Sequence, residues 1–230
     1  MKKSLAIAIV AVIVIATILL LRPAGQQPPA PPIEGLPWQI EMLANGDSRV
    51  FGLELGHSTI GDARARFGED MEIGVIAGRG EAGSLEAYYD NVTAGVILGK
   101  MILVATLDKT TLERLRDRAI RKQYMHDTTY RYILDPDDLP LVWRAPIATI
   151  TFVPAVSIDA ETVLKRFGPP QERLRASDQV EHFLYPDKGL DVALDNKGKE
   201  VLQYVAPREF ARLRAPLMHG AKETNQSGHF

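Results

Sequence analysis

The sequence has 230 residues, of which 46% are hydrophobic and 24% are charged, a composition typical of a globular protein with one or two modest domains. Its formal net charge of −2 lacks the basic excess that phosphate recognition generally requires, so we expect no nucleic acid partner. The absence of cysteine excludes a disulfide framework, thiolate chemistry and the acylated cysteine of a lipoprotein.

Residues 5–21 are apolar, uncharged and interrupted by one polar residue, Thr17. As a helix, at about 1.5 Å per residue, they would extend ~26 Å, near the lower limit for crossing a bilayer. We therefore predict a transmembrane anchor over residues 1–22, with a cleaved signal peptide or a buried helix as alternatives. Lys2 and Lys3 would stay in the cytoplasm by the positive-inside rule, which places the remaining chain in the periplasm of a bacterial inner membrane.

Residues 23–35 are rich in proline and predict an extended polyproline II linker between the membrane and the folded part. The alternative is a docking segment for an aromatic-lined groove of another protein. In either interpretation this segment does not belong to a core.

The folded part predicts an α+β protein made of two tandem duplicated modules, each with a helix packed on a small antiparallel sheet. The first module covers residues 36–126 and the second residues 139–216. The duplication is indicated by residues 57–68 and 157–168, which each predict a capped helix ending in Phe-Gly, at Phe67 and Phe167. A period of about a hundred residues indicates duplication of a whole module, because solenoid repeats are shorter, at about 20 to 50 residues.

A predicted hairpin follows each helix. Residues 96–107 are almost wholly apolar, so we expect this hairpin to be the more central one and to be covered on both faces. Residues 190–205 alternate between apolar and polar side chains around an Asn-Lys-Gly turn, which predicts a half-exposed hairpin. Upstream of the two hairpins, Tyr89 and Tyr185 occupy matching positions.

Two further segments complete the domain assignment. Residues 127–138 contain Asp135-Pro136, a turn or helix-start signal, and are predicted to be the linker between the modules. Residues 217–230 are polar and without periodicity, which predicts a disordered tail.

The glycine-rich segment Gly78-Arg79-Gly80-Glu81-Ala82-Gly83 matches the spacing of a dinucleotide-binding loop, and it follows a predicted strand. Against a nucleotide site, the helix expected after it is short, and the second module has no equivalent glycines. We interpret the segment as a loop between strands. A nucleotide-using enzyme with this loop at its site remains an alternative.

No other catalytic or metal-binding pattern is apparent in the sequence. The five histidines do not stand at the short spacings that metal sites use, and no nucleophile elbow is present, so we expect no cofactor and no metal. His57 is predicted to lie at the surface beside a helix cap. His182 lies in a predicted strand, where a partly buried and hydrogen-bonded ring is expected.

Basic residues gather in a helix predicted around residues 112–122 and again near the end of the second module. Such a surface is either simply solvated or contacts anionic lipid headgroups or an acidic partner. This candidate interaction surface consists of Arg114, Arg116, Arg118, Arg121, Lys122, Arg208, Arg212 and Arg214.

A capped helix, a Phe-Gly stop and an antiparallel hairpin with a tyrosine in its first strand resemble the small module of the SmpA/OmlA lipoproteins and the related beta-lactamase-inhibitor-protein fold. The resemblance rests on residues 157–170, Phe183-Leu184-Tyr185 and residues 190–205, with a fainter match at residues 58–68. It implies two-layer α+β modules in tandem, no enzymatic activity, and work by protein contact in the cell envelope. The chain differs from the lipoproteins because an expected anchor replaces the acylated cysteine.

From these features we expect a membrane-anchored periplasmic binding or scaffolding protein that is not catalytic and has an envelope protein as its partner. The alternatives are a protein that binds a lipid or another small apolar ligand against residues 96–107, and the nucleotide-using enzyme described above.

Overall fold

The computed structural model describes residues 32–226, with side chains up to residue 218. The predicted anchor and all but the last few residues of the proline-rich linker lie outside this range. Within residues 32–226, no helix is both long enough and apolar enough to cross a membrane.

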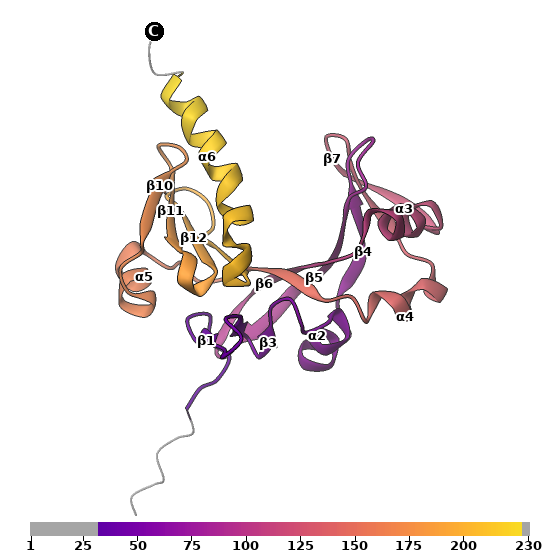
Figure 1. Ribbon diagram of the computed structural model, residues 1–230, viewed down its shortest axis with the longest axis horizontal. Helices are drawn as coiled ribbons and strands as arrows, with labels where there is room; N and C mark the ends of the chain where they lie inside the picture. Colours follow the sequence, from indigo (N-terminus) through magenta and orange to yellow (C-terminus); the bar gives the residue numbers. More distant parts are fainter. Residues whose placement is uncertain (1–31, 227–230) are drawn as a thin grey trace, which may run out of the picture. The chain divides into compact units, whose positions relative to one another are not determined.

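The described chain combines five helices with a large antiparallel sheet, so the predicted α+β class is confirmed (Figure 1). The helices are α2 (Ile60–Phe67), α3 (Lys109–Asp117), α4 (Leu139–Val142), α5 (Ala160–Phe167) and α6 (Phe210–Gln226).

The large sheet contains ten strands in the order β10-β11-β12-β13-β9-β6-β5-β4-β8-β7, and every pairing is antiparallel. A separate small sheet is formed by β1 (Glu41–Met42), β2 (Ser48–Val50) and β3 (Leu53–Glu54). The strands of the large sheet are β4 (Glu72–Ala77), β5 (Ser84–Ala94), β6 (Ile97–Ala105), β7 (Arg121–His126), β8 (Thr129–Ile133), β9 (Ile147–Pro154), β10 (Glu172–Arg175), β11 (Val180–Tyr185), β12 (Leu190–Asp195) and β13 (Val201–Val205).

Both predicted modules contribute to this one sheet. Strand β9 of the second module pairs with β6 of the first, with Ile102 opposite Thr151, and on its other side with β13, where Thr151 faces Gln203. The core is continuous as well, because the Phe51 ring lies 5.4 Å from the ring of Phe152. The halves therefore share backbone hydrogen bonds and buried side chains.

The predicted linker over residues 127–138 is corrected by the structure. Residues 129–133 form β8, which pairs with β4 on one side and with β7 on the other. The chain reverses between β7 and β8 at Asp127, whose φ of 46° is left-handed. The Asp135-Pro136 signal does begin a helical turn, because the Asp135 side chain accepts a hydrogen bond from the Asp137 amide at 2.9 Å.

The predicted disordered tail is also corrected, since α6 continues to Gln226. Phe210, Leu213 and Leu217 recur at helical spacing and pack against Leu184 and Val205 of the sheet. This apolar stripe extends past residue 216, the predicted end of the second module.

The two predicted capped helices are confirmed, and their caps are now assigned. Thr59 and Asp62 form a reciprocal capping box at the start of α2. At the start of α5, the Asp159 carboxylate accepts a hydrogen bond from the Thr162 amide at 2.8 Å. Hydrogen bonds from the Thr162 side chain and from its backbone amide lower the pKa of the Asp159 carboxyl below its ordinary value.

Helices α2 and α5 each end at a glycine whose carbonyl accepts a hydrogen bond from a tyrosine hydroxyl. The glycines after α2 and α5 have φ angles of 97° and 84°, which L side chains rarely adopt. The Tyr89 hydroxyl donates to the Gly68 carbonyl at 3.3 Å, and the Tyr185 hydroxyl donates to the Gly168 carbonyl at 2.9 Å. In both places the tyrosine ring lies 5.9 Å from the phenylalanine that precedes the glycine. Burial raises the pKa of Tyr89 to about 12.

The two faces of the sheet are covered differently. The inner face is buried over the central strands of the sheet, where it carries Tyr89, Leu103 and Tyr185. On the outer face, α6 packs against Leu184 of β11 and Val205 of β13. Asp191 of β12 stands opposite Leu184 and is only 1% exposed, although the alternation predicted it in solvent. Val104 on β6 remains partly exposed.

The predictions for the two hairpins are therefore partly confirmed. Residues 96–107 contain β6, a central strand of the sheet, as expected. Their predicted coverage on both faces is wrong, because Ile102 and Val104 on the outer face remain partly exposed in the described structure.

Candidate functional site

A groove lies on the outer face of the sheet, between α3 and α6, and we call it the central groove. Its volume is about 600 Å³, within the range of small-molecule sites. Val104 and Thr149 form part of its floor, where they stand opposite each other on β6 and β9. Leu112 of α3 and Leu213 of α6 also line it. The groove thus combines apolar and polar side chains from both halves of the chain.

Two arginines stand at the α6 side of the central groove. Arg208 forms an ion pair with the buried carboxylate of Asp47, and Arg212 pairs with Glu209 at 3.0 Å. Their side chains are 52% and 83% exposed, so both guanidinium groups remain accessible to a ligand. Each guanidinium is paired with one carboxylate, but its exposed N–H groups can still donate to an anionic group at the edge of the groove.

A second groove, the basic groove, lies beside the glycine-rich loop. It has a volume of about 460 Å³ and is lined by Gly78, Arg79, Arg116, Lys122 and Tyr130, among others. Lys122 Nζ lies 3.7 Å from the centroid of the Tyr130 ring, a cation–π distance, and Arg116 donates to the Glu81 carbonyl at 2.6 Å. The structure thus brings together two features that lie far apart in the sequence, the loop and part of the predicted basic surface.

The glycine-rich loop does not have the arrangement of a dinucleotide site. Strand β5 follows it where that site requires a helix, and β5 is antiparallel to β4. The Gly78 amide, which would face a phosphate, donates to the Glu81 side chain at 3.2 Å. A Cβ at Gly83 would lie 2.4 Å from the Ile76 carbonyl oxygen, so this glycine is required by the tight turn. The interpretation as a loop between strands is confirmed.

The predicted basic helix is partly wrong. Helix α3 ends at Asp117, and Arg121 and Lys122 lie on strand β7. Cross-strand pairing explains the change, because Lys122 stands opposite Tyr132 of β8. Arg118 pairs with Asp138 at 2.9 Å.

The remaining predicted basic residues are dispersed. Within residues 32–226, Arg114 and Arg121 are exposed and form no ion pair. Arg214 makes a two-pronged contact with Glu172 of β10, at 2.7 and 2.8 Å. The structure therefore groups Arg208 with Arg212 and Arg116 with Lys122, and the eight residues do not form one continuous cluster.

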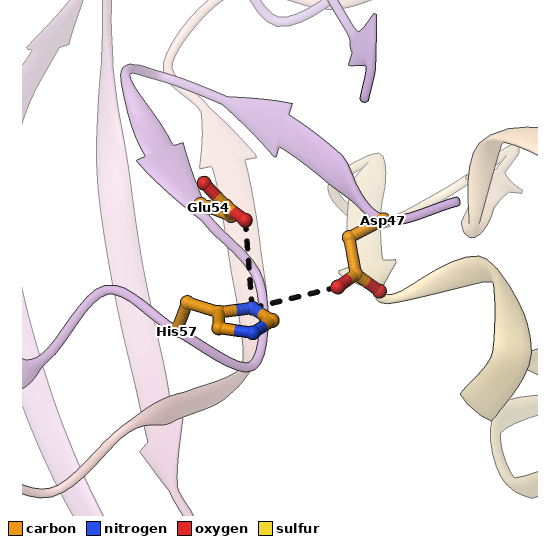
Figure 2. Close-up of side chains that lie close together, drawn as sticks. All are labelled: Asp47, Glu54 and His57. Atoms are coloured by element: carbon orange, nitrogen blue, oxygen red, sulfur yellow. Dashed lines mark ion pairs between the residues drawn. The ribbon is translucent and has the colours of Figure 1, made fainter. Parts of the chain in front are cut away.

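Asp47, Glu54 and His57 form the group of side chains in residues 32–226 that could hold a metal ion (Figure 2). His57 Nδ1 lies 3.4 Å from Asp47 and 3.5 Å from Glu54, and its ring is 54% exposed, which agrees with the predicted surface position. Each carboxylate is already paired with an arginine, Asp47 with Arg208 and Glu54 with Arg49. These pairs neutralise the negative charge that would attract a cation.

His182 behaves as its sequence context predicts. Its ring is buried, with the side chain 11% exposed, and Nδ1 lies 2.8 Å from the carboxylate of Asp191. The pair has a structural role, since it supplies a hydrogen-bond partner to two polar groups in an otherwise apolar layer.

The outer face next to the central groove is polar. The Lys100 ammonium donates to Asp90 and, at 3.0 Å, to the Tyr88 hydroxyl. Hydrogen bonds to Asp90 from Lys100 and from the Tyr88 hydroxyl lower the pKa of the Asp90 carboxyl below its ordinary value. The uncovered face thus changes from apolar at Val104 to charged at Lys100.

Comparison of the chain with protein-family models, with curated proteins and with solved structures found no match. The function is therefore inferred from the grooves themselves. The apolar segment 96–107, where the sequence suggested a ligand surface as an alternative, supplies Val104 and Leu107 to the central groove. The helices beside the groove become neighbours only through long-range pairing, so no local pattern predicted the groove itself.

Proposed function

We propose that this chain is a membrane-anchored periplasmic binding or scaffolding protein of the bacterial cell envelope, without catalytic activity, and that the central groove receives a protein partner. The proposal combines the predicted anchor at residues 5–21 and the proline-rich linker with one structural observation, an uncovered groove on the sheet between two helices.

The groove supports a partner with an apolar segment and an acidic group. Val104, Leu112 and Leu213 offer apolar contacts, while Arg208 and Arg212 stand where they would meet a carboxylate. The exposed Arg114 on α3 and Arg121 on β7 are two separate positions that would contact anionic lipid headgroups or a further acidic surface.

Duplication of one module, of the kind found in SmpA/OmlA lipoproteins, is part of the same proposal. It is supported by the Tyr89 and Tyr185 hydroxyls, which contact equivalent glycines. In this view, the shared sheet results from pairing of β6 with β9 after duplication, and α6 is an addition that covers only the second copy.

Site-specific photo-crosslinking in the native envelope tests the proposal. A photoreactive side chain at Thr149, in the groove, should yield one discrete adduct, whereas the same group at the exposed Thr93, outside the groove, should not. Arg212→Glu should weaken the adduct, because it places a negative charge beside the acidic partner. Recovery of the Thr149 variant only as a free monomer would contradict the proposal.

A small amphipathic ligand is the second candidate, favoured by the volume of about 600 Å³. Native mass spectrometry of the protein purified from its host would detect such a ligand as a constant mass increment. An increment that Val104→Arg abolishes, in the absence of a Thr149 adduct, would favour the ligand over the protein partner.

A further inference from the structure

The basic groove shares no lining residue with the central groove. Among the described residues, no acidic side chain lines it. Its lining consists of three cations, three residues with a hydroxyl group and two glycines of the loop: Arg79, Arg116 and Lys122, then Thr128, Tyr130 and Tyr132, and finally Gly78 and Gly80. The side chains of the groove are therefore mostly hydrogen-bond donors, and half of the donors are positively charged.

Lys122 and Arg79 have no carboxylate partner. Neither side chain forms an ion pair within residues 32–226. Lys122 is held by two aromatic rings instead, because its Nζ atom lies 3.7 Å from the centroid of Tyr130 and 5.2 Å from that of Tyr132. The rings carry no net charge, so this contact positions the ammonium without neutralising it.

The third cation, Arg116, is positioned by the glycine-rich loop. Its Nη1 atom donates to the Glu81 carbonyl at 2.6 Å. Its Nη2 atom lies 3.5 Å from the carboxylate of Asp117, which is 72% exposed, so water screens this pair. The Glu81 carboxylate accepts a hydrogen bond from the Gly78 amide and does not line the groove. At least two of the three positive charges are therefore without a counterion.

Three hydroxyl groups add neutral donors to the basic groove. Tyr130 and Tyr132 stand on the same face of β8, and Lys122 of β7 is directly opposite Tyr132. Thr128 lies in the turn that joins the two strands. In the described part of the chain, none of the three hydroxyls has a hydrogen-bond partner. Because they belong to a paired hairpin, these groups are held in place before a ligand arrives.

A phosphate monoester matches this set of donors better than a carboxylate does. Near neutral pH it carries a charge of about −1.5 to −2 and has three acceptor oxygens that point in different directions. A carboxylate has a single charge and two oxygens in one plane, which one arginine can satisfy. The donors of the basic groove come from three separate elements, the loop, α3 and the β7–β8 hairpin. A tetrahedral dianion can accept from all three.

The size of the basic groove indicates a ligand with more atoms than the phosphate alone. Its volume of about 460 Å³ lies in the range of small-molecule sites. The arrangement also differs from a dinucleotide site, because the donors are side chains and not the amides of the glycine-rich loop.

We infer that the basic groove binds a phosphate monoester, with Lys122 and Arg79 as its principal partners and Arg116 as the third cation. The phosphate is supplied either by a lipid headgroup or by a small soluble phosphorylated molecule. The two grooves have no residue in common, so this inference and the proposed function can fail separately.

Isothermal titration calorimetry on the full chain, in a non-ionic detergent and a phosphate-free buffer, tests the inference. The probes are glycerol phosphate, as a soluble monoester, and dihexanoyl phosphatidic acid, which carries the same headgroup on two short acyl chains. We expect each to bind with a stoichiometry of one. Tighter binding of phosphatidic acid identifies a lipid as the source, and equal or tighter binding of glycerol phosphate identifies a soluble molecule.

Three controls separate the phosphate from other contributions. Glycerol lacks the charge, and sodium acetate is an anion without the tetrahedral group. Dihexanoyl phosphatidylcholine enters the detergent in the same way as phosphatidic acid, but its phosphate is a diester beside a cation. None of the three should bind.

Two variants and a matched control locate the site. Lys122→Gln removes the ammonium and should weaken the binding of glycerol phosphate at least about tenfold, the loss of one hydrogen bond to a charged group. Arg79→Gln, in the exposed loop, should weaken it in the same direction. Lys109→Gln removes an exposed ammonium from α3 outside the groove and should leave binding unchanged. Circular dichroism verifies the folding of each variant.

Three results would overturn the inference: no heat from either monoester at millimolar concentration, equal binding of acetate, or unchanged binding by the folded Lys122→Gln and Arg79→Gln variants. If Lys122→Gln fails to fold, Arg79→Gln decides the question, because that side chain forms no ion pair in the described chain.

Discussion

The N-terminal half of the described chain, up to Ile133, and the C-terminal half, from Leu139, are alike on the inner face of the sheet and different on the outer face. On the inner face, Tyr89 and Tyr185 make the same contact with the end of a helix. On the outer face, α6 buries Leu184 completely, whereas Val104 stays partly exposed in the central groove. The inner face holds the fold together, and the difference on the outer face leaves a surface for binding.

The largest predicted effect compares the phenylalanines of the inner face. Phe167 is 4% exposed, so Phe167→Ala should lower the free energy of unfolding by about 3 to 4 kcal/mol. Phe67→Ala should cost clearly less, because Phe67 is only partly buried. Urea denaturation of the full chain in detergent measures both changes. Equal losses would show that the two halves are packed more alike than their exposures indicate.

A second pair of variants contrasts the outer faces. Asp191→Ala removes the partner of the buried His182 beneath α6 and should lower the free energy of unfolding by about 2 kcal/mol. Asp90→Ala removes the partner of Lys100 on the open face and should have no measurable effect on the melting temperature, because water replaces the contact. A large loss for Asp90→Ala would mean that the open face is covered by something in solution.

The tyrosine hydroxyls allow a finer comparison of the shared contact. Tyr185→Phe should cost about 1 kcal/mol of unfolding free energy, the typical value of one hydrogen bond. Tyr89→Phe should cost less, since its hydroxyl lies 3.3 Å from the Gly68 carbonyl while that of Tyr185 lies 2.9 Å from Gly168. The reverse order would be evidence against equivalent roles for the two hydroxyls.

The smallest effect concerns the attachment of α6. Hydrogen bonds from Arg214 hold the pKa of Glu172 below its ordinary value of 4.5. Because the folded-state pKa is lowered, this contact contributes fully above that value and is lost as the pH falls through the lower folded-state pKa. The melting temperatures of the unmodified chain and of Glu172→Gln should therefore differ by a constant amount at neutral pH and converge in acid. A difference independent of pH would exclude this ion pair as its cause.

Local signals in the sequence identified much of the inner face. The cap residues, the glycine stops and the matching tyrosines each depend on a few neighbouring residues, and the structure confirms their positions. The hydrogen-bonded His182 was predictable because a polar ring inside an apolar strand needs a partner.

Features that depend on long-range pairing were not predictable from local pattern. Arg121 and Lys122 continue the basic pattern of α3, yet pairing with β8 makes them part of a strand. Polar residues follow Phe210, Leu213 and Leu217, so the sequence predicted a disordered tail from residue 217 where α6 continues. Without a helix packed on this face, Asp191 was expected to be exposed to solvent. The central groove and the basic groove exist only once distant segments have come together.

The most direct test of the open outer face uses the absence of native cysteine. In the purified chain, the thiol of a Val104→Cys variant should react readily with a maleimide, whereas that of Leu184→Cys should react only after denaturation, because Leu184 is fully buried. In native envelopes the proposed partner should protect the Val104→Cys thiol. Equal reactivity of Val104→Cys in envelopes and in purified protein would contradict the proposal that the central groove is occupied by a partner.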